Sequence, residues 1–144
     1  MIIREIAPSD TEAVTQLSGE LGYPSSKETM ERRIAGFAGR DDHAVFVACV
    51  EDAVAAWIDL SVVHHLQTEP YGEIGGFVFS ERCRNTGIGK QLIARAEEWM
   101  RERGLRRSLV RSQIARDAAH RFYLREGYAR IKTSAVFEKE LSER

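Results

Sequence analysis

Cysteine is scarce in this chain, and neither a long apolar run nor a strong excess of charge is present. The only two cysteines in 144 residues, Cys49 and Cys83, belong to no Cys-x-x-Cys pair and to no Cys/His cluster with metal spacing. This argues against a disulfide scaffold and a zinc site, so no metal is expected. Both thiols are interpreted as free, in a reducing compartment.

The first ten residues, MIIREIAPSD, reach a charge at Arg4 and contain no apolar stretch of the length that a signal peptide or a membrane span needs. The net charge of -1 also lacks the wide positive footprint of a nucleic-acid-binding protein. We therefore expect a cytoplasmic protein whose partners include neither a membrane nor nucleic acid.

The composition, 43% hydrophobic and 30% charged, suits a single globular domain over residues 1–144. No internal repeat, low-complexity tract or linker interrupts it. Apolar residues alternate in some stretches and recur at helical spacing in others. Strands are predicted at 1–7, 43–52, 53–63, 71–79, 106–113 and 128–141, with a turn at Glu51 and Asp52 between the second and third, and with the last as one or two strands. Helices are predicted at 11–22, 25–39, 88–103 and 117–127, and the third carries an apolar stripe of Ile88, Leu92, Ala96, Trp99 and Met100. This order predicts an α/β chain with a mixed sheet that contains an antiparallel meander.

The stretch RNTGIGKQLI, residues 84–93, places a glycine turn between a predicted strand and a predicted helix. Such a turn directs unpaired amide N–H groups and the positive end of a helix dipole toward one point, which suits an anion. Glycines at 87 and 89 allow an oxygen-rich group to approach the backbone, and Arg84 and Lys90 add positive charge. A turn that merely connects strand to helix is the structural alternative.

Two common phosphate motifs do not match this turn. A nucleotide P-loop would need glycine where Arg84 stands and a serine or threonine where Gln91 stands. A dinucleotide fingerprint would need glycine in place of Leu92 and a position after the first strand of a parallel unit. Both alternatives are disfavoured.

The sequence RNTGIG resembles the Gln/Arg-x-x-Gly-x-Gly/Ala motif of the GCN5-related N-acetyltransferases, and AHRFYLREGY resembles that family's second signature. The predicted element order agrees over nearly the whole chain. The resemblance implies a mixed, mostly antiparallel sheet flanked by about four helices. It also implies a splayed strand pair that holds acetyl-CoA as cosubstrate, and a homodimer is one assembly seen in such families.

The resemblance also carries specific residues into the cofactor site. The strand GGFVF would bind the pantetheine arm through the main chain of Phe77, Val78 and Phe79, as an added strand would. The turn would bind the pyrophosphate through Arg84, Asn85, Thr86, Gly87, Ile88, Gly89 and Lys90. The chain departs from the family at Arg116, where an asparagine often stands, so a side-chain contact from that position is not carried over.

Acetyl transfer to an amine needs a neutral amine, a polarised carbonyl and a proton for the departing thiolate. By resemblance, the Tyr123 hydroxyl lies beside the cofactor sulfur and donates that proton; the alternative is a core tyrosine bonded to a carbonyl. Glu73, in the strand before the turn, resembles by position a carboxylate that some relatives use as base through water. Its alternative is a solvated charge at a strand end.

Other candidates for the proton acceptor are weaker. His64 and His65 end the preceding strand, and an imidazole can relay a proton at neutral pH. Glu69 and Glu81 are held by a turn and by the cofactor loop. His120 is more simply a packing residue or a helix-cap partner.

The sequence therefore predicts an N-acetyltransferase that moves acetyl from acetyl-CoA directly to the primary amine of a small molecule. Residues 24–39 and 64–72 are expected to line the acceptor pocket. Two alternatives stay open: an acetyltransferase of protein N-termini or lysines, and a module that binds acetyl-CoA without turnover.

Overall fold

The computed structural model describes residues 1–83, 86–112 and 117–142. These residues divide into two compact units, Met1–Arg111 and Ser112–Arg144. The first unit holds the sheet and three α-helices, and the second holds the fourth α-helix and the C-terminal segment. Among the described helices, none is long and apolar enough to cross a membrane. The single domain expected over 1–144 stays a prediction.

The N-terminal strand and the two helices after it form as capping and apolar spacing predict. Strand β1 spans Ile2–Glu5, a 3-10 turn spans Pro8–Asp10, α1 spans Thr11–Glu20 and α2 spans Lys27–Phe37. Ser26 caps α2, because its hydroxyl accepts a hydrogen bond of 3.1 Å from the Thr29 N–H. Each helix is amphipathic, burying Val14 and Leu17 on α1 and Ile34 on α2.

The next three strands form the predicted antiparallel meander. β2 spans His43–Val50, β3 spans Ala53–His65 and β4 spans Thr68–Phe79. The expected turn at Glu51 and Asp52 has φ angles of 52° and 64°, as in a type I′ hairpin. The strand order is β1-β2-β3-β4-β5, and of the described strand pairs only β4 with β5 is parallel. The predicted fold class is therefore confirmed.

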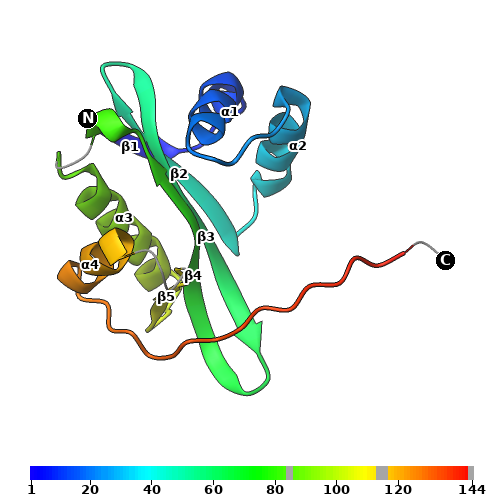
Figure 1. The fold of residues 1–144 in the computed structure, drawn as a ribbon, viewed down its shortest axis with the longest axis vertical. Coiled ribbons are helices and arrows are strands. Elements are labelled where there is room, and N and C mark those ends of the chain that lie inside the picture. The colour runs from blue at the N-terminus through cyan, green and yellow to red at the C-terminus, as the bar shows by residue number, and fades with distance from the viewer. Residues whose placement is uncertain (84–85, 113–116, 143–144) are drawn as a thin grey trace. The chain divides into compact units, whose positions relative to one another are not determined.

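Helices cover both faces of this sheet within the first unit (Figure 1). On one face the Trp57 Nε1–H donates to Ser18 Oγ of α1 over 3.0 Å. On the other face the guanidinium of Arg95, on α3 (Ile88–Glu102), lies 4.4 Å from the ring centre of Phe46. Successive strand residues point to opposite faces. In β3 the side chain of Trp57, and with it those of 59 and 61, therefore lies on what we term the α1/α2 face, and the side chains of 58 and 60 lie on the α3 face.

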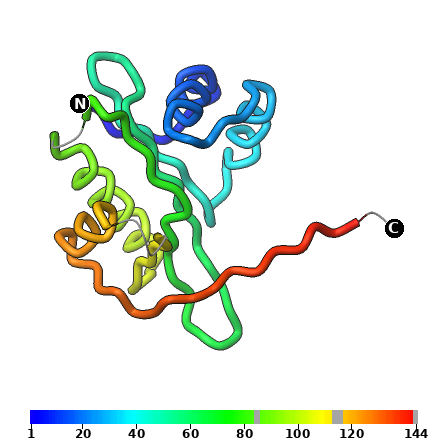
Figure 2. The backbone as a smooth tube through the Cα atoms, viewed as in Figure 1, coloured from blue at the N-terminus to red at the C-terminus, as the bar shows by residue number. Residues whose placement is uncertain are grey.

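Helix α3 joins β4 to β5 through the chain path traced in Figure 2, after a 3-10 turn at Glu81–Cys83. Its buried stripe includes the five residues predicted from spacing, namely Ile88, Leu92, Ala96, Trp99 and Met100. Strand β5 spans Ser108–Val110, which is shorter than the 106–113 expected. It pairs with β4 over Gly72–Ile74, and β4 then continues to Phe79 with no described strand along that edge. The splayed pair implied by the resemblance stays a prediction, because β5 ends at Val110.

The second unit holds α4, Asp117–Arg125, followed by an extended segment. The strands predicted at 128–141 are wrong, since none of residues 128–142 lies in a strand. An alternating pattern sets only the directions of side chains, whereas a strand also needs a neighbouring backbone to pair with. The apolar side chains of this segment are 68% to 93% exposed, and they are Ile131, Val136, Phe137 and Leu141.

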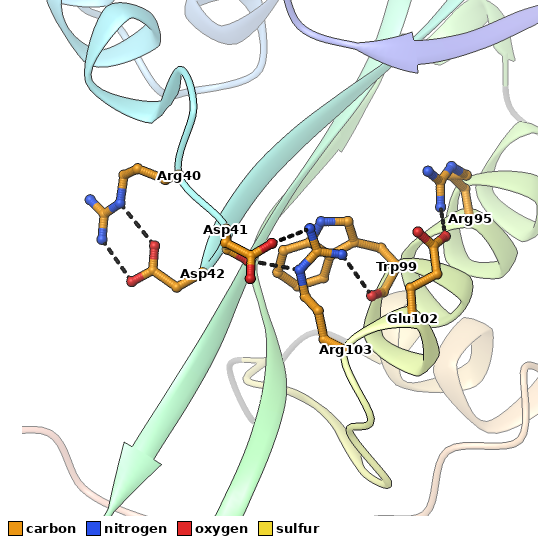
Figure 3. A network of polar contacts seen from close by, with 7 residues as sticks. All are labelled: Arg40, Asp41, Asp42, Arg95, Trp99, Glu102 and Arg103. Carbon is orange, nitrogen blue, oxygen red and sulfur yellow. Dashed lines mark hydrogen bonds and ion pairs between the residues drawn. The ribbon is translucent and has the colours of Figure 1, made fainter.

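Arg103, just beyond α3, ties the end of that helix to the loop before β2 (Figure 3). Its guanidinium donates to the backbone carbonyl of Asp41 over 2.7 Å and to that of Trp99 over 3.1 Å. The same group lies 4.1 Å from the ring centre of Trp99. The ion pair with the Asp41 carboxylate adds little, because that side chain is 95% exposed. The planar fork of donors is what makes this connection.

We expect Arg103→Lys to lower the free energy of unfolding by about 2 kcal/mol, because lysine keeps the charge but loses the fork and the stacking. Urea unfolding at pH 7 measures this. The control is Arg40→Lys, since Arg40 pairs with Asp42 at 2.9 Å on the surface (Figure 3), where half of each side chain is exposed. The control should unfold nearly like wild type, and equal losses in both variants would contradict this role of Arg103.

Asp10 is a buried carboxylate that fixes β1 to the start of α1. Arg4 donates to its two oxygens from Nη1 over 2.7 Å and from Nη2 over 2.8 Å, and the Ala7 N–H donates over 2.7 Å. The Arg4 guanidinium holds the pKa of Asp10 below its usual value, with help from Ala7, although burial acts in the opposite direction. The ionised form of Asp10 therefore stabilises the fold.

This stabilisation should depend on pH in one direction. It is fully present above the unfolded pKa of about 3.9 and is lost as pH falls through the lower folded value. Asp10→Asn should lower the free energy of unfolding by about 2 kcal/mol at pH 7, and the difference from wild type should shrink below about pH 4. Urea unfolding at pH 7 and pH 3 tests this against Asp42→Asn, an exposed ion-pair control. A deficit of equal size at both pH values would rule out the linkage.

Candidate active site

Strand β4 carries one extra residue opposite the middle of β3. Asp59 pairs with Gly76 and Leu60 pairs with Ile74, so Gly75 has no opposite residue. This is a β-bulge, which bends a strand and changes the direction of the side chains after it. The bulge lies immediately after the last residue of β4 that pairs with β5. The pairing of β4 with β5 therefore ends where β4 bends.

The bulge determines on which face of the sheet each side chain of the predicted cofactor strand lies. Glu73, before the bulge, and Val78, after it, lie on the α1/α2 face. Phe77 and Phe79 lie on the α3 face, with ring centres 5.7 Å apart. The residues expected to contact pantetheine thus lie on the expected strand, along the edge from which β5 departs. Their binding role stays a prediction.

The glycine turn leads directly into α3. Arg84 and Asn85 lie outside the described residues. Thr86 closes the turn, because its N–H donates to the Cys83 carbonyl over 3.2 Å and its hydroxyl donates to the same oxygen over 2.6 Å. Gly87 is the N-cap residue with φ 84°, a left-handed conformation that glycine adopts without strain.

The first turn of α3 has the properties of an anion site. The amide groups of Ile88, Gly89 and Lys90 have no acceptor within the helix, because they precede its first complete turn. This first turn contains no acidic residue, and Lys90 is exposed. The positive end of the dipole of a 15-residue helix is directed to the same place. The turn is therefore suited to a pyrophosphate.

Glu73 forms an ion pair with an arginine that follows β5. Arg111 Nε donates to Glu73 Oε1 over 2.9 Å, and this bond raises the pKa of the Arg111 guanidinium. The arginine side chain is more than half exposed, so the pair contributes little to stability. One oxygen of this candidate base is thus already engaged.

A second carboxylate, Asp59, lies on the same face as Glu73. Its Oδ1 is 2.5 Å from His43 Nε2, and apart from this ion pair neither atom has a hydrogen-bond partner among the described residues. The ring of Phe37 stacks on His43 with centres 4.1 Å apart. Burial raises the pKa of the Asp59 carboxyl; His43 acts to lower it, and the charge of Glu73 raises it further.

The other candidates for the proton acceptor lie away from Glu73 and Asp59. His64 and His65 are exposed near the tip of the β3–β4 hairpin, about 10 and 13 Å along β3 from the residue opposite Glu73. His65 Nε2 lies 3.3 Å from the Tyr71 hydroxyl. Glu69 is exposed near that tip, and Glu81 is exposed before the glycine turn. Within the described residues, no group of three or more His, Cys, Asp or Glu side chains could hold a metal ion.

The segments expected to line the acceptor pocket border two separate cavities. Residues of 24–39 line a cavity of about 320 Å³ that also contains His43, and residues of 64–72 line one of about 750 Å³. Neither cavity includes Glu73 or Asp59 among its lining residues. These two cavities are lined by different segments of the expected acceptor pocket.

Tyr123 lies on α4 in the second unit and is half-buried. Its ring centre is 5.5 Å from that of Phe122, and its carbonyl accepts from the Tyr128 N–H over 3.0 Å. His120 is half-buried on the same helix. The position of the Tyr123 hydroxyl beside the cofactor sulfur stays a prediction.

The sequence analysis did not identify Asp59, His43 or Arg111. Asp59 had a detectable signal, because an acidic residue interrupts the otherwise apolar strand AVAAWIDLSVV. His43 and Arg111 reach the site through strand register, which no local pattern indicates.

Comparison with known proteins tests the family assignment. The model of the acetyltransferase (GNAT) family matches residues 11–128. The aminoalkylphosphonate N-acetyltransferase of Salmonella typhimurium is 33% identical over 135 residues, which cover 88% of this chain and 83% of that protein. The aminoglycoside N(6')-acetyltransferase type 1 of Stenotrophomonas maltophilia is 24% identical over 144 residues, 96% of this chain and 93% of that protein.

The fold also agrees with solved structures. The aminoglycoside acetyltransferase AAC(6')-Iy, in complex with the bisubstrate analogue CoA-S-monomethyl-acetylneamine, superposes with a TM-score of 0.85 at 18% identity, covering 97% of this chain and 98% of that one. The chain therefore belongs to the GNAT family and is an acetyl-CoA-dependent N-acetyltransferase.

Proposed function

We propose that this enzyme acetylates the primary amine of a small molecule in a ternary complex with acetyl-CoA. The observation that carries the proposal is the edge of β4 beyond Ile74, where the pairing with β5 has ended, followed by a glycine turn that caps α3. An extended pantetheine chain can pair with the open edge of β4 while the turn binds the pyrophosphate. The thioester then lies between the two strands.

Relatives guide the choice of acceptor. The relatives with 33% and 24% identity act on aminoalkylphosphonates and on aminoglycosides by name. Both are small amines, which favours a small-molecule acceptor over a protein N-terminus or lysine. A module that binds acetyl-CoA without turnover is disfavoured, because two carboxylates lie on one face of the sheet beside the point where the pairing of β4 with β5 ends.

A coenzyme A release assay tests the function. The panel should contain aminoalkylphosphonates, aminoglycosides, polyamines, amino acids and peptide N-termini, each with acetyl-CoA and purified enzyme. Release above the rate without amine, for at least one small amine and not for peptides, is expected. Release with peptides but with no small amine would favour the protein acetyltransferase. If none of the amines raises release above the background rate, the binding module is favoured.

The pyrophosphate site can be tested with Gly89→Val. A β-branched side chain in the first turn of α3 should obstruct the approach of phosphate oxygens and raise the Kd of acetyl-CoA by about tenfold or more, that is, by at least about 1.4 kcal/mol. Calorimetry measures the Kd, and a thermal melt confirms folding. The matched control is Gly19→Val in α1, where an added Cβ would meet nothing within 4 Å. Unchanged affinity in folded Gly89→Val would contradict the site.

The role of Tyr123 can be tested with Tyr123→Phe. A phenol stays protonated at neutral pH and can donate as negative charge develops on the leaving thiolate. The variant should keep its melting temperature and acetyl-CoA affinity but lose kcat by on the order of 10²-fold. Steady-state kinetics with an accepted amine measures this. A wild-type kcat, where chemistry limits the rate, would remove Tyr123 from the mechanism, and early melting would indicate a packing role.

A further inference from the structure

We propose that Asp59 accepts the proton of the acceptor's ammonium group, and that His43 positions Asp59 for this step. The inference rests on the proposed acetyl transfer to an amine. It assigns the proton acceptor to a residue of β3, whereas the sequence pointed to Glu73 on β4. Three features of the described residues carry it.

The first feature is location. Asp59 stands opposite the bulge, beside the place where β5 leaves β4. A Cβ added at Gly75 would lie 3.6 Å from Asp59 Oδ2, so this oxygen faces the bare backbone of the bulge. Gly75 places no side chain over the carboxylate, while the Trp57 ring covers the neighbouring Gly76. An amine approaching a thioester at this edge of β4 can therefore reach Oδ2.

The second feature is that the two oxygens of the Asp59 carboxylate have different surroundings. Oδ1 is buried and contacts His43 Nε2 at 2.5 Å, while the Asp59 side chain as a whole is 32% exposed. The His43 ring is in turn fixed by stacking on Phe37 at the end of α2. The His43 imidazole, packed on Phe37, thus holds Oδ1 in place, and Oδ2 is left for the substrate. His43 acts through Asp59 and is a positioning residue.

The third feature is the contrast with Glu73. Glu73 Oε1 forms an ion pair with Arg111, whereas His43 contacts Oδ1 of Asp59 and no described residue forms an ion pair with Oδ2. Partial burial also raises the pKa of Asp59, which makes its carboxylate a stronger proton acceptor than an ordinary aspartate. The charged groups acting on Asp59 are His43 on β2 and Glu73 on β4, while Arg111 acts through Glu73. Helix α2 contributes the uncharged ring of Phe37.

The reaction balances with these groups. Asp59 takes one proton from R–NH3⁺ and leaves the neutral amine, whose nitrogen forms a bond to the acetyl carbonyl carbon. The carbon–sulfur bond breaks, the thiolate leaves with the electron pair, and the second nitrogen proton is lost as the amide forms. One of the two protons released converts the thiolate to coenzyme A, and the other passes from Asp59 to solvent.

The test compares pH profiles of kcat/KM for wild type, Asp59→Asn, His43→Gln and Glu73→Gln. The first amine probe is 2-aminoethylphosphonate, replaced by the fastest amine of the panel if that amine differs. Asp59→Asn should lose on the order of 10²-fold in kcat at pH 7 and keep the Kd of acetyl-CoA. Its rate should then rise with pH up to the pKa of the free amine, because solvent must deprotonate it.

Substitution of His43 and of Glu73 should shift the acid limb of the pH profile of kcat/KM in opposite directions. His43→Gln removes a group that lowers the pKa of Asp59, so the limb should shift to higher pH. Glu73→Gln removes a group that raises it, so the limb should shift to lower pH with a loss in kcat below about fivefold at pH 7. A merely structural role would not produce opposite shifts. Asp52→Asn, an exposed carboxylate in the turn between β2 and β3, is the control and should match wild type.

A second measurement does not depend on turnover. The Asp59 carboxyl carbon, identified in ¹³C NMR spectra by its absence from Asp59→Asn, should titrate above the ordinary aspartate value of about 3.9 in wild type. It should shift in opposite directions in the His43 and Glu73 variants. If no amine is turned over, the proposed function fails while this titration still decides the state of Asp59. Titration at the ordinary value, or a larger loss of kcat in Glu73→Gln than in Asp59→Asn, would overturn the inference.

Discussion

The pairing of β3 with β4, interrupted by one extra residue at Gly75, is the constraint from which the candidate site follows. Because the side chains of a strand alternate with period two, a single extra residue moves every later side chain to the opposite face. Without the bulge, Glu73 and Phe77 would share a face. With it, the carboxylates of Glu73 and Asp59 lie on the α1/α2 face, and Phe77 and Phe79 lie on the α3 face.

The same bulge coincides with the end of the pairing between β4 and β5. The pairing with β5 ends at Ile74, the residue before the bulge. Beyond that residue β4 leads through a 3-10 turn to Gly87, whose left-handed conformation starts α3. An open strand edge and a helix N-terminus are thereby joined by one short connection, which is what a long cofactor with an anionic end requires.

Much of the fold could be predicted from local patterns, and part of the site could not. The meander, the turn at Glu51 and Asp52, and the stripe of α3 each have a signature within a few residues, and all three are confirmed. The segment 128–141 has the alternation of a strand but forms none, since pairing is not encoded locally. The contact of His43 with Asp59 depends on the register of β2 against β3, and the contact of Arg111 with Glu73 depends on where β5 stops, so neither could be read from the sequence.

The double glycine of β4 has an evolutionary consequence. A Cβ added at Gly76 would lie 2.9 Å from the Trp57 ring, which is itself hydrogen-bonded to Ser18 on α1. Any side chain at this position would have to displace the indole and, through it, the helix. Inherited change at Gly76 is therefore opposed by the packing of β3 against α1.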